Sequence, residues 1–202
     1  MKTRNSLGSF GSFVALLASL SLLSNSHAQD QQKGAPQALT AALGTQPLTA
    51  LSPDGAFYAV ATPDGRIRYG GTQDGAAVHI FHLCQPRTVI FSPDGHLLAA
   101  AGGGGSDCHP ARLKVWQVSD GRLLCKVESG MGRNPALSFS PDSTLLASTA
   151  AGVNINVWQL PKGTLQGSFT PKCLPSHLAF SKECKVLIAL GTDGSVQHFP
   201  MP

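Results

Sequence analysis

Charged residues are scarce in this chain of 202 residues, at 13% against the usual quarter, while 42% of the residues are hydrophobic. This composition excludes a chain that is disordered throughout, because it supplies enough apolar surface for one domain with a core. The few lysines and arginines are scattered along the chain and form no cluster. Binding to nucleic acid depends on grouped cations that release counterions from the phosphates, so the sequence predicts no nucleic-acid partner.

Motifs of catalysis and of phosphate binding are also missing. The sequence has no G-x-S-x-G elbow, no phosphate loop and no H-E-x-x-H pattern. The glycine tract at residues 102–105 lacks the Lys and the following Ser or Thr that complete a phosphate cradle. We therefore expect no enzyme activity and no cofactor.

The seven histidines and five cysteines form no metal-binding pattern. No C-x-x-C or H-x-x-x-H spacing occurs, and the compact group Asp107, Cys108 and His109 falls short of the four convergent ligands of a structural zinc site. His79 and His82 are three residues apart in an expected strand, which places them on opposite faces of a sheet. The sequence thus predicts no metal site.

An uncharged hydrophobic run lies near the N-terminus. Residues 13–23 carry no charge, and Lys2 and Arg4 precede them. Ser26 and Ala28 place small residues where signal peptidase requires them. A transmembrane anchor is the alternative, but the run is shorter than the roughly 20 residues that span a bilayer. The pattern therefore favours a cleaved secretory signal.

This signal is expected to occupy residues 1–28, with Gln29 as the start of the mature chain and residues 29–37 as a flexible linker. Its removal lowers the formal net charge from +4 to +2, because two of the basic residues are lost with it. The sequence thus predicts an exported protein, secreted or periplasmic, with no membrane span in the mature chain.

A turn motif recurs four times and divides the rest of the chain into units. S-P-D-G stands at residues 52–55 and 92–95, S-P-D-S at 140–143 and S-K-E-C at 181–184, so the motifs start 40, 48 and 41 residues apart. Proline at the second position sets φ, the aspartate bonds its own backbone and glycine accepts a positive φ, so the motif predicts a tight turn. The longer second interval comes from an insertion at residues 102–111.

Short apolar runs flank each turn and predict up to four strands per unit. In the second unit these runs lie at residues 88–91, 97–101, 113–116 and 123–127. The fourth unit ends after its third run, at residues 196–199, so its own fourth strand is missing. Hairpins in series of this kind indicate a repeat protein made of antiparallel sheets.

The order of these motifs resembles that of the WD40-repeat β-propellers, whose blades carry F-S-P-D-G, then L-L-A-S, then a strand that ends in V-W-D. Residues 91–95 and 139–142 match the first of these, and V-W at 115–116 and 157–158 matches the last. Gln follows both tryptophans where the family usually has Asp, and Phe199 stands at the Trp position of the fourth unit.

The resemblance covers residues 48–202 and implies an all-β fold, a β-propeller of four WD40-like four-stranded antiparallel blades in a domain spanning residues 38–202. We expect residues 38–43 to form the outer strand of the last blade and close the ring, because the family joins both chain ends in one blade. The alternatives are an open half-ring that needs a second copy, giving a homo-oligomer, and a truncated part of a longer propeller.

The resemblance also implies structural roles for three side chains. His82, with Asp107 and Trp116, would form the family's buried hydrogen-bond network in one blade. The other blades would be held by apolar packing, since the Gly-His pair that begins many family repeats is missing. Trp116 and Trp158 are expected to pack between adjacent blades.

The family places the fourth-to-first and the second-to-third strand connections on one face, usually the binding face. The resemblance therefore implies a scaffold for a protein or peptide partner, which would contact the polar residues Arg87, Asp107, His109, Arg133, Asn154, His177 and Asp193. The alternative function is a propeller enzyme that acts on a small molecule or a carbohydrate. It would use Asp64, Asp107 and Asp193, and it would need two of these carboxyl groups about 5–10 Å apart in an open pocket.

The cysteines suggest one cross-link. Export implies an oxidising compartment, where disulfides persist. Cys84 lies in the connection that enters the second unit, and Cys108 lies in the long insertion of that unit, on the same face by the family's rule. We expect a disulfide between them, and the alternative is that all five thiols are reduced or unrelated.

Overall fold

The computed structural model describes residues 48–73, 77–103, 112–128, 135–149 and 154–201. The expected signal, linker and closing strand at residues 1–28, 29–37 and 38–43 lie outside this part of the chain. Asp107, Cys108, His109 and Arg133 lie outside it as well. All elements assigned in the described residues are β-strands, and none of these residues forms a helix that could cross a membrane.

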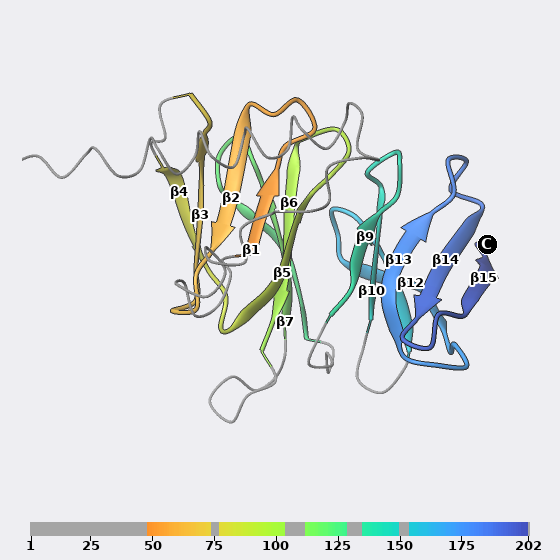
Figure 1. Cartoon of the computed structure of the whole chain (residues 1–202). Helices are drawn as coiled ribbons and strands as arrows, with labels where there is room; N and C mark the ends of the chain where they lie inside the picture. The colour runs from red at the N-terminus through yellow and green to blue at the C-terminus, as the bar shows by residue number, and fades with distance from the viewer. Residues whose placement is uncertain (1–47, 74–76, 104–111, 129–134, 150–153, 202) are drawn as a thin grey trace, which may run out of the picture.

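The strands form four antiparallel sheets, in chain order (Figure 1). The first sheet contains β1 (Leu48–Leu51), β2 (Phe57–Ala61), β3 (Arg66–Gly71) and β4 (Ala77–His82). The second contains β5 (Pro86–Phe91), β6 (Leu97–Gly102), β7 (Arg112–Gln117) and β8 (Leu123–Glu128). The third contains β9 (Leu137–Phe139), β10 (Leu145–Thr149), β11 (Ile155–Gln159) and β12 (Thr164–Phe169). The fourth contains β13 (Pro175–Phe180), β14 (Val186–Gly191) and β15 (Val196–Pro200). The predicted all-β fold of four repeated sheets is confirmed, and the last sheet has three strands among the described residues.

The recurring turn motifs form the hairpins between the first and second strands. In the second sheet, Ser92 Oγ accepts a hydrogen bond from the N–H of Leu97 at 2.9 Å and donates to Asp94 Oδ1 at 2.5 Å. The same carboxylate accepts from the N–H of His96 at 2.9 Å, and Gly95 has a φ of 74°, which favours glycine. The equivalent bonds occur in the first and third sheets, so the motif builds the predicted turn.

Strand register makes the sheets equivalent to one another. The pairs at the tryptophan position are Tyr58 with Gly70, Leu98 with Trp116, Leu146 with Trp158, and Leu187 with Phe199. Phe199 therefore occupies in the fourth sheet the place that tryptophan takes in the second and third. The first sheet has glycine there, with a tyrosine opposite.

Three apolar cores lie between successive sheets, since side chains alternate between the two faces of each strand. The core between the first and second sheets includes Ile67, Phe81, Leu98 and Trp116. The core between the second and third includes Leu113, Val115, Leu146 and Trp158. The core between the third and fourth includes Ile155, Val157, Leu187 and Ala189. The second and third sheets therefore bury both of their faces.

Both tryptophans lie between adjacent sheets. The Trp116 ring stacks on Phe81 of the preceding sheet, with ring centroids 4.8 Å apart. Trp158 packs in the core shared with the second sheet, and its indole Nε1–H donates a hydrogen bond to Ser148 Oγ at 2.9 Å.

His82 does not form the expected buried network with Trp116, because its side chain is exposed. Strand alternation is the reason. Phe81 points from β4 towards the second sheet and stacks on the tryptophan, so the next residue points to the opposite side. The expectation of a buried His82 was therefore wrong.

The four sheets follow one another in a row, with the first sheet at one end and the fourth at the other (Figure 1). Contacts join β1 to β5, β5 to β9 and β9 to β13. Among the described residues, no comparable contact joins the fourth sheet to the first. Closure of the ring by residues 38–43 therefore stays a prediction.

Each sheet has two ends with different connections. One end of each sheet carries the fourth-to-first and second-to-third strand connections, and we call it the loop end. There the Leu83 N–H donates a hydrogen bond to the carbonyl of Gly65 at 2.9 Å. The opposite end carries the first-to-second and third-to-fourth strand connections, and we call it the turn end. There the Val118 N–H donates a hydrogen bond to the carbonyl of His96 at 2.9 Å. These bonds agree with the sorting of connections that the family resemblance implied.

Candidate functional site

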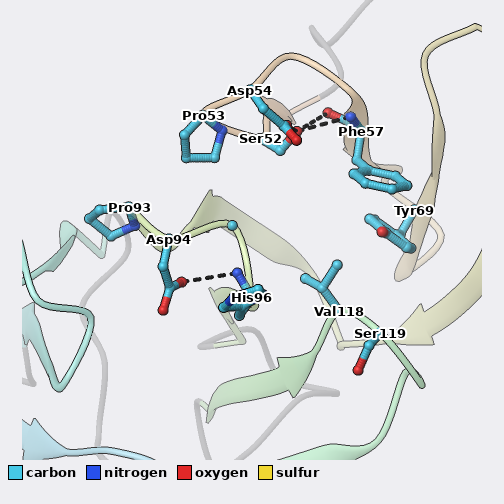
Figure 2. A pocket seen from close by; sticks show the side chains of 11 residues that line it. Ser52, Pro53, Asp54, Phe57, Tyr69, Pro93, Asp94, His96, Val118 and Ser119 are labelled. Atoms are coloured by element: carbon cyan, nitrogen blue, oxygen red, sulfur yellow. Dashed lines mark hydrogen bonds between the residues drawn. The ribbon is translucent and has the colours of Figure 1, made fainter.

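A groove of about 570 Å³ lies at the turn end, between the first and second sheets. We call it the turn-end groove. It is lined by Ser52, Pro53, Asp54, Phe57, Tyr69, Pro93, Asp94, Gly95, His96, Val118 and Ser119. The two turn motifs of these sheets supply most of these residues, so the elements that form the hairpins also form the groove (Figure 2). Its volume lies within the usual range for small-ligand sites, about 300–1,000 Å³.

One wall of the groove is aromatic. Phe57 of β2 stacks on Tyr69 of β3, with ring centroids 5.3 Å apart and an interplanar angle of 27°. Tyr69 also contacts Phe91 of the second sheet, with centroids 6.1 Å apart. Figure 2 shows the rings of Phe57 and Tyr69 on one side of the groove and Pro93, Asp94 and His96 on the other. Packing between the sheets therefore fixes the width of the groove.

Two carboxylates line the groove, and both belong to turns. The hydrogen bond from Ser52, with one from the N–H of Ala56, lowers the pKa of Asp54 below the usual value. Burial acts to raise the pKa of Asp94, but hydrogen bonds from Ser92 and from the N–H of His96 outweigh it and leave that pKa lowered. Both side chains are therefore ionised at neutral pH.

The groove is negative in charge. Burial, followed by the charge of Asp54, raises the pKa of Tyr69, so the phenol stays protonated. None of the described residues that line the groove is Lys or Arg. The arrangement offers two negative charges beside an aromatic wall, which is suited to hold a cationic group.

The residues expected on the binding face lie elsewhere, where they fall in the described chain. Arg87 on β5 and His177 on β13 are exposed. Asn154 is exposed and accepts a hydrogen bond from Thr170 Oγ1 at 3.1 Å. Asp193 is exposed and accepts from the N–H of Ser195 at 3.0 Å. These residues belong to different sheets, and a common binding face made of them stays a prediction.

The carboxylates named for the alternative enzyme are also separated. Asp64 lies in the first sheet, where Thr62 Oγ1 donates a hydrogen bond to it. Asp193 lies in the fourth sheet, at the other end of the row, and hydrogen bonds from Ser195 lower its pKa. Within the described chain, no group of three His, Cys, Asp or Glu side chains could hold a metal ion.

The cysteines differ in state. Cys84 is disulfide-bonded, whereas Cys125, Cys173 and Cys184 are free. The predicted partner, Cys108, lies outside the described residues, so the pairing itself stays a prediction. Burial raises the pKa of the Cys125 thiol, which makes this core cysteine a poor nucleophile.

Comparison with known proteins agrees with the repeated sheets and turn motifs. Over 135 residues, the chain is 30% identical to the small ribosomal subunit protein RACK1 of Caenorhabditis elegans. Over 105 residues, it is 27% identical to an uncharacterised WD repeat-containing protein of Synechocystis. The chain is thus similar to WD40-repeat proteins in its sequence and in its repeated antiparallel sheets. No family model matches the chain.

The two relatives are longer proteins. The match to RACK1 covers 60% of this chain and 38% of the relative, and the match to the Synechocystis protein covers 51% and 28%. The chain thus spans well under half the length of the curated relatives it matches. The functions of these whole relatives therefore cannot be assigned to this chain from the similarity alone.

The turn-end groove was missed in the sequence because its residues had already been assigned to turns. The aspartates of the first two motifs were interpreted only as turn formers. No spacing in the sequence shows that Tyr69 lies beside them, because that contact depends on how the sheets pack. The aspartate that recurs in successive turns was the one sequence feature that pointed to an acidic groove.

Proposed function

We propose that this chain is an exported protein-interaction domain that binds a peptide segment of its partner in the turn-end groove. The groove is the observation that carries the proposal, because it is a concave surface built from two rigid hairpins. The similarity to WD40-repeat proteins supports a binding role, since WD40 domains typically serve as scaffolds for protein partners. The fold alone specifies no chemistry.

The charges of the groove favour a basic peptide. Asp54 and Asp94 supply two ionised carboxylates, and a lysine or arginine side chain that reaches between them would form charge-assisted hydrogen bonds. Phe57 and Tyr69 supply the aromatic surface along which the stem of such a side chain packs. The peptide would run across the turns, between Pro53 and Pro93.

Removing one charge from the groove should weaken binding. Peptide display on the mature chain, residues 29–202, is expected to select sequences with Lys or Arg at one fixed position. Asp54→Asn and Asp94→Asn should each raise the Kd of the selected peptide about tenfold or more, because asparagine keeps the turn acceptor and loses the charge. Fluorescence anisotropy measures this Kd. The effect should persist from about pH 5 to pH 8, because both carboxyl pKa values lie below their usual value of about 4.

Asp142 provides a matched control, because it occupies the same turn position in the third sheet and does not line the groove. Asp142→Asn should leave the Kd unchanged. Selected peptides without a basic residue, or an equal loss with Asp142→Asn, would contradict a cation-binding groove.

Export is supported by the N-terminal pattern and by the disulfide at Cys84, since disulfides persist in oxidising compartments. When residues 1–202 are produced in a bacterial host with an active secretion system, the exported chain should begin at Gln29 by mass spectrometry. Leu17→Arg places a charge in the apolar run and should leave the chain uncleaved in the cytoplasm. Asn5→Arg adds the same charge before the run and should not affect export. An uncleaved wild-type chain in the cytoplasm would contradict the proposal.

A further inference from the structure

The fourth residue of each turn motif has the same backbone conformation and a different side chain. These residues are Gly55, Gly95, Ser143 and Cys184, with φ values of 69°, 74°, 61° and 57°. All four lie in the left-handed region of φ, where glycine is favoured and serine is tolerated in the third turn. The side chain at this position therefore varies on a constant backbone.

Ser143 connects the third turn to the second. Its Oγ accepts a hydrogen bond from the N–H of Asp94 at 3.3 Å, and the residue is buried. Asp94 is the third residue of the second turn motif. Between the second and third sheets, an oxygen of the later turn thus occupies the N–H of the aspartate in the earlier turn.

Gly95 has no side chain to form this bridge between the second turn and the first. A Cβ atom placed on Gly95 would lie 3.7 Å from Cδ of Pro53, the residue that precedes Asp54. The fourth residue of the later turn thus faces the same part of the earlier turn in both pairs of sheets. Among the described residues, none other than Asp54 itself accepts a hydrogen bond from the Asp54 N–H. This N–H is therefore open to a ligand in the turn-end groove.

We propose that the ligand of the turn-end groove places a carbonyl oxygen on the Asp54 N–H, and that Gly95 keeps this donor open. The oxygen would take the place that Ser143 Oγ takes on the Asp94 N–H. This contact rests on the proposed function of the groove and specifies its ligand. The ligand carries an acceptor for the N–H as well as a cation for the two carboxylates. A peptide main chain with a basic side chain supplies both, whereas a free polyamine supplies only the cation.

The corresponding space between the second and third sheets has neither feature. Ser143 already occupies the Asp94 N–H there. Val115 takes the register position of Tyr69, since each is paired with the alanine seven residues after the first serine of its turn motif. The open N–H and the aromatic wall therefore coincide between the first and second sheets and not between the second and third.

Gly95→Ser tests the contact, because the third turn already holds serine at this position with a similar φ. The new hydroxyl should occupy the Asp54 N–H and raise the Kd of the selected basic peptide about five- to tenfold, measured by fluorescence anisotropy. Gly55→Ser is the matched control, because Gly55 has the same turn position and nearly the same φ but does not line the groove. It should leave the Kd unchanged.

Two further measurements separate this hydrogen bond from mere filling of the groove. In NMR spectra, peptide binding should move the Asp54 amide proton of the wild-type chain downfield. Gly95→Ser should move it downfield before peptide is added, whereas Gly95→Ala, which adds a methyl group and no acceptor, should not. Replacing each peptide amide in turn by an ester weakens the preceding carbonyl as an acceptor. One such ester should raise the Kd about threefold for the wild-type chain and leave it unchanged for Gly95→Ser.

The outcomes distinguish this contact from the function of the groove. Gly95→Ser that binds the peptide as tightly as Gly55→Ser would overturn the contact and leave a basic-peptide groove in place. So would an ester scan in which no single position weakens binding to the wild-type chain, a result that requires no variant of the protein. A wild-type chain that selects no basic peptide would overturn the proposed function and the contact together.

Discussion

Replacing Trp158 by alanine should lower the free energy of unfolding by about 3–5 kcal/mol, towards the upper end of that range. The side chain is 8% exposed and fills the core between the second and third sheets. Its loss leaves a cavity there and also removes the partner of the Ser148 hydroxyl, which is 0% exposed. A loss of this size in a domain of this length lowers the melting temperature by roughly 10 °C. Urea unfolding followed by circular dichroism measures the difference.

Trp116→Ala is the matched comparison and should cost less. Trp116 is 4% exposed and loses a stacking contact with Phe81, but none of the described residues gives it a buried hydroxyl partner of the kind that Ser148 supplies to Trp158. Ser148→Ala separates the contribution of the hydrogen bond from that of the buried ring, because it removes the hydroxyl that accepts from Trp158 and keeps the indole. Equal melting shifts for the two tryptophan variants would contradict the ordering.

Cys84→Ser should lower the free energy of unfolding by about 3.5 kcal/mol under oxidising conditions. With Cys108 as partner, the disulfide closes a loop of about 25 residues, and the loss of that constraint on the unfolded chain accounts for this value. Cys108→Ser should have the same effect, and the double variant should lose no more than either single one. Thiol titration of the unfolded wild-type chain should find three free thiols, because Cys125, Cys173 and Cys184 are free.

Cys184→Ser is the control for this prediction. Cys184 is a free, partly buried cysteine in the fourth turn, so its replacement should change the stability by less than about 0.5 kcal/mol. If Cys108→Ser leaves the stability unchanged while Cys84→Ser lowers it, the disulfide partner has been assigned wrongly. Addition of a reductant should lower the free energy of unfolding of the wild-type chain to that of the Cys84→Ser variant.

The repeats could be predicted from the sequence because they depend on local chemistry. In the turn at residues 92–95, proline, aspartate and glycine each set one feature of the backbone, and all three lie within four residues. The third and fourth turns keep the shape without glycine, since Ser143 and Cys184 have φ values of 61° and 57°. The position of Trp158 between adjacent sheets was also predictable, because it follows from the family's motif order.

Tertiary packing decided the rest. His82 faces outwards because its neighbour Phe81 stacks on Trp116, and an alternation pattern alone does not tell which of two adjacent residues points to the next sheet. The turn-end groove lies where Tyr69, which stacks on Phe57 in the first sheet, contacts Phe91 in the second, so that two turns about 40 residues apart in the chain lie side by side.

The turns, the strands and the number of repeated sheets could be predicted from the residues alone, because they depend on hydrogen bonds and backbone angles of near neighbours. Which face each sheet buries, where the groove lies and which face stays exposed depend on how the sheets pack against one another. The exposure of Val196, against the complete burial of Ile67 at the same register position, is the clearest case. Both are β-branched residues in third strands, and the difference between them is whether another sheet packs over that face.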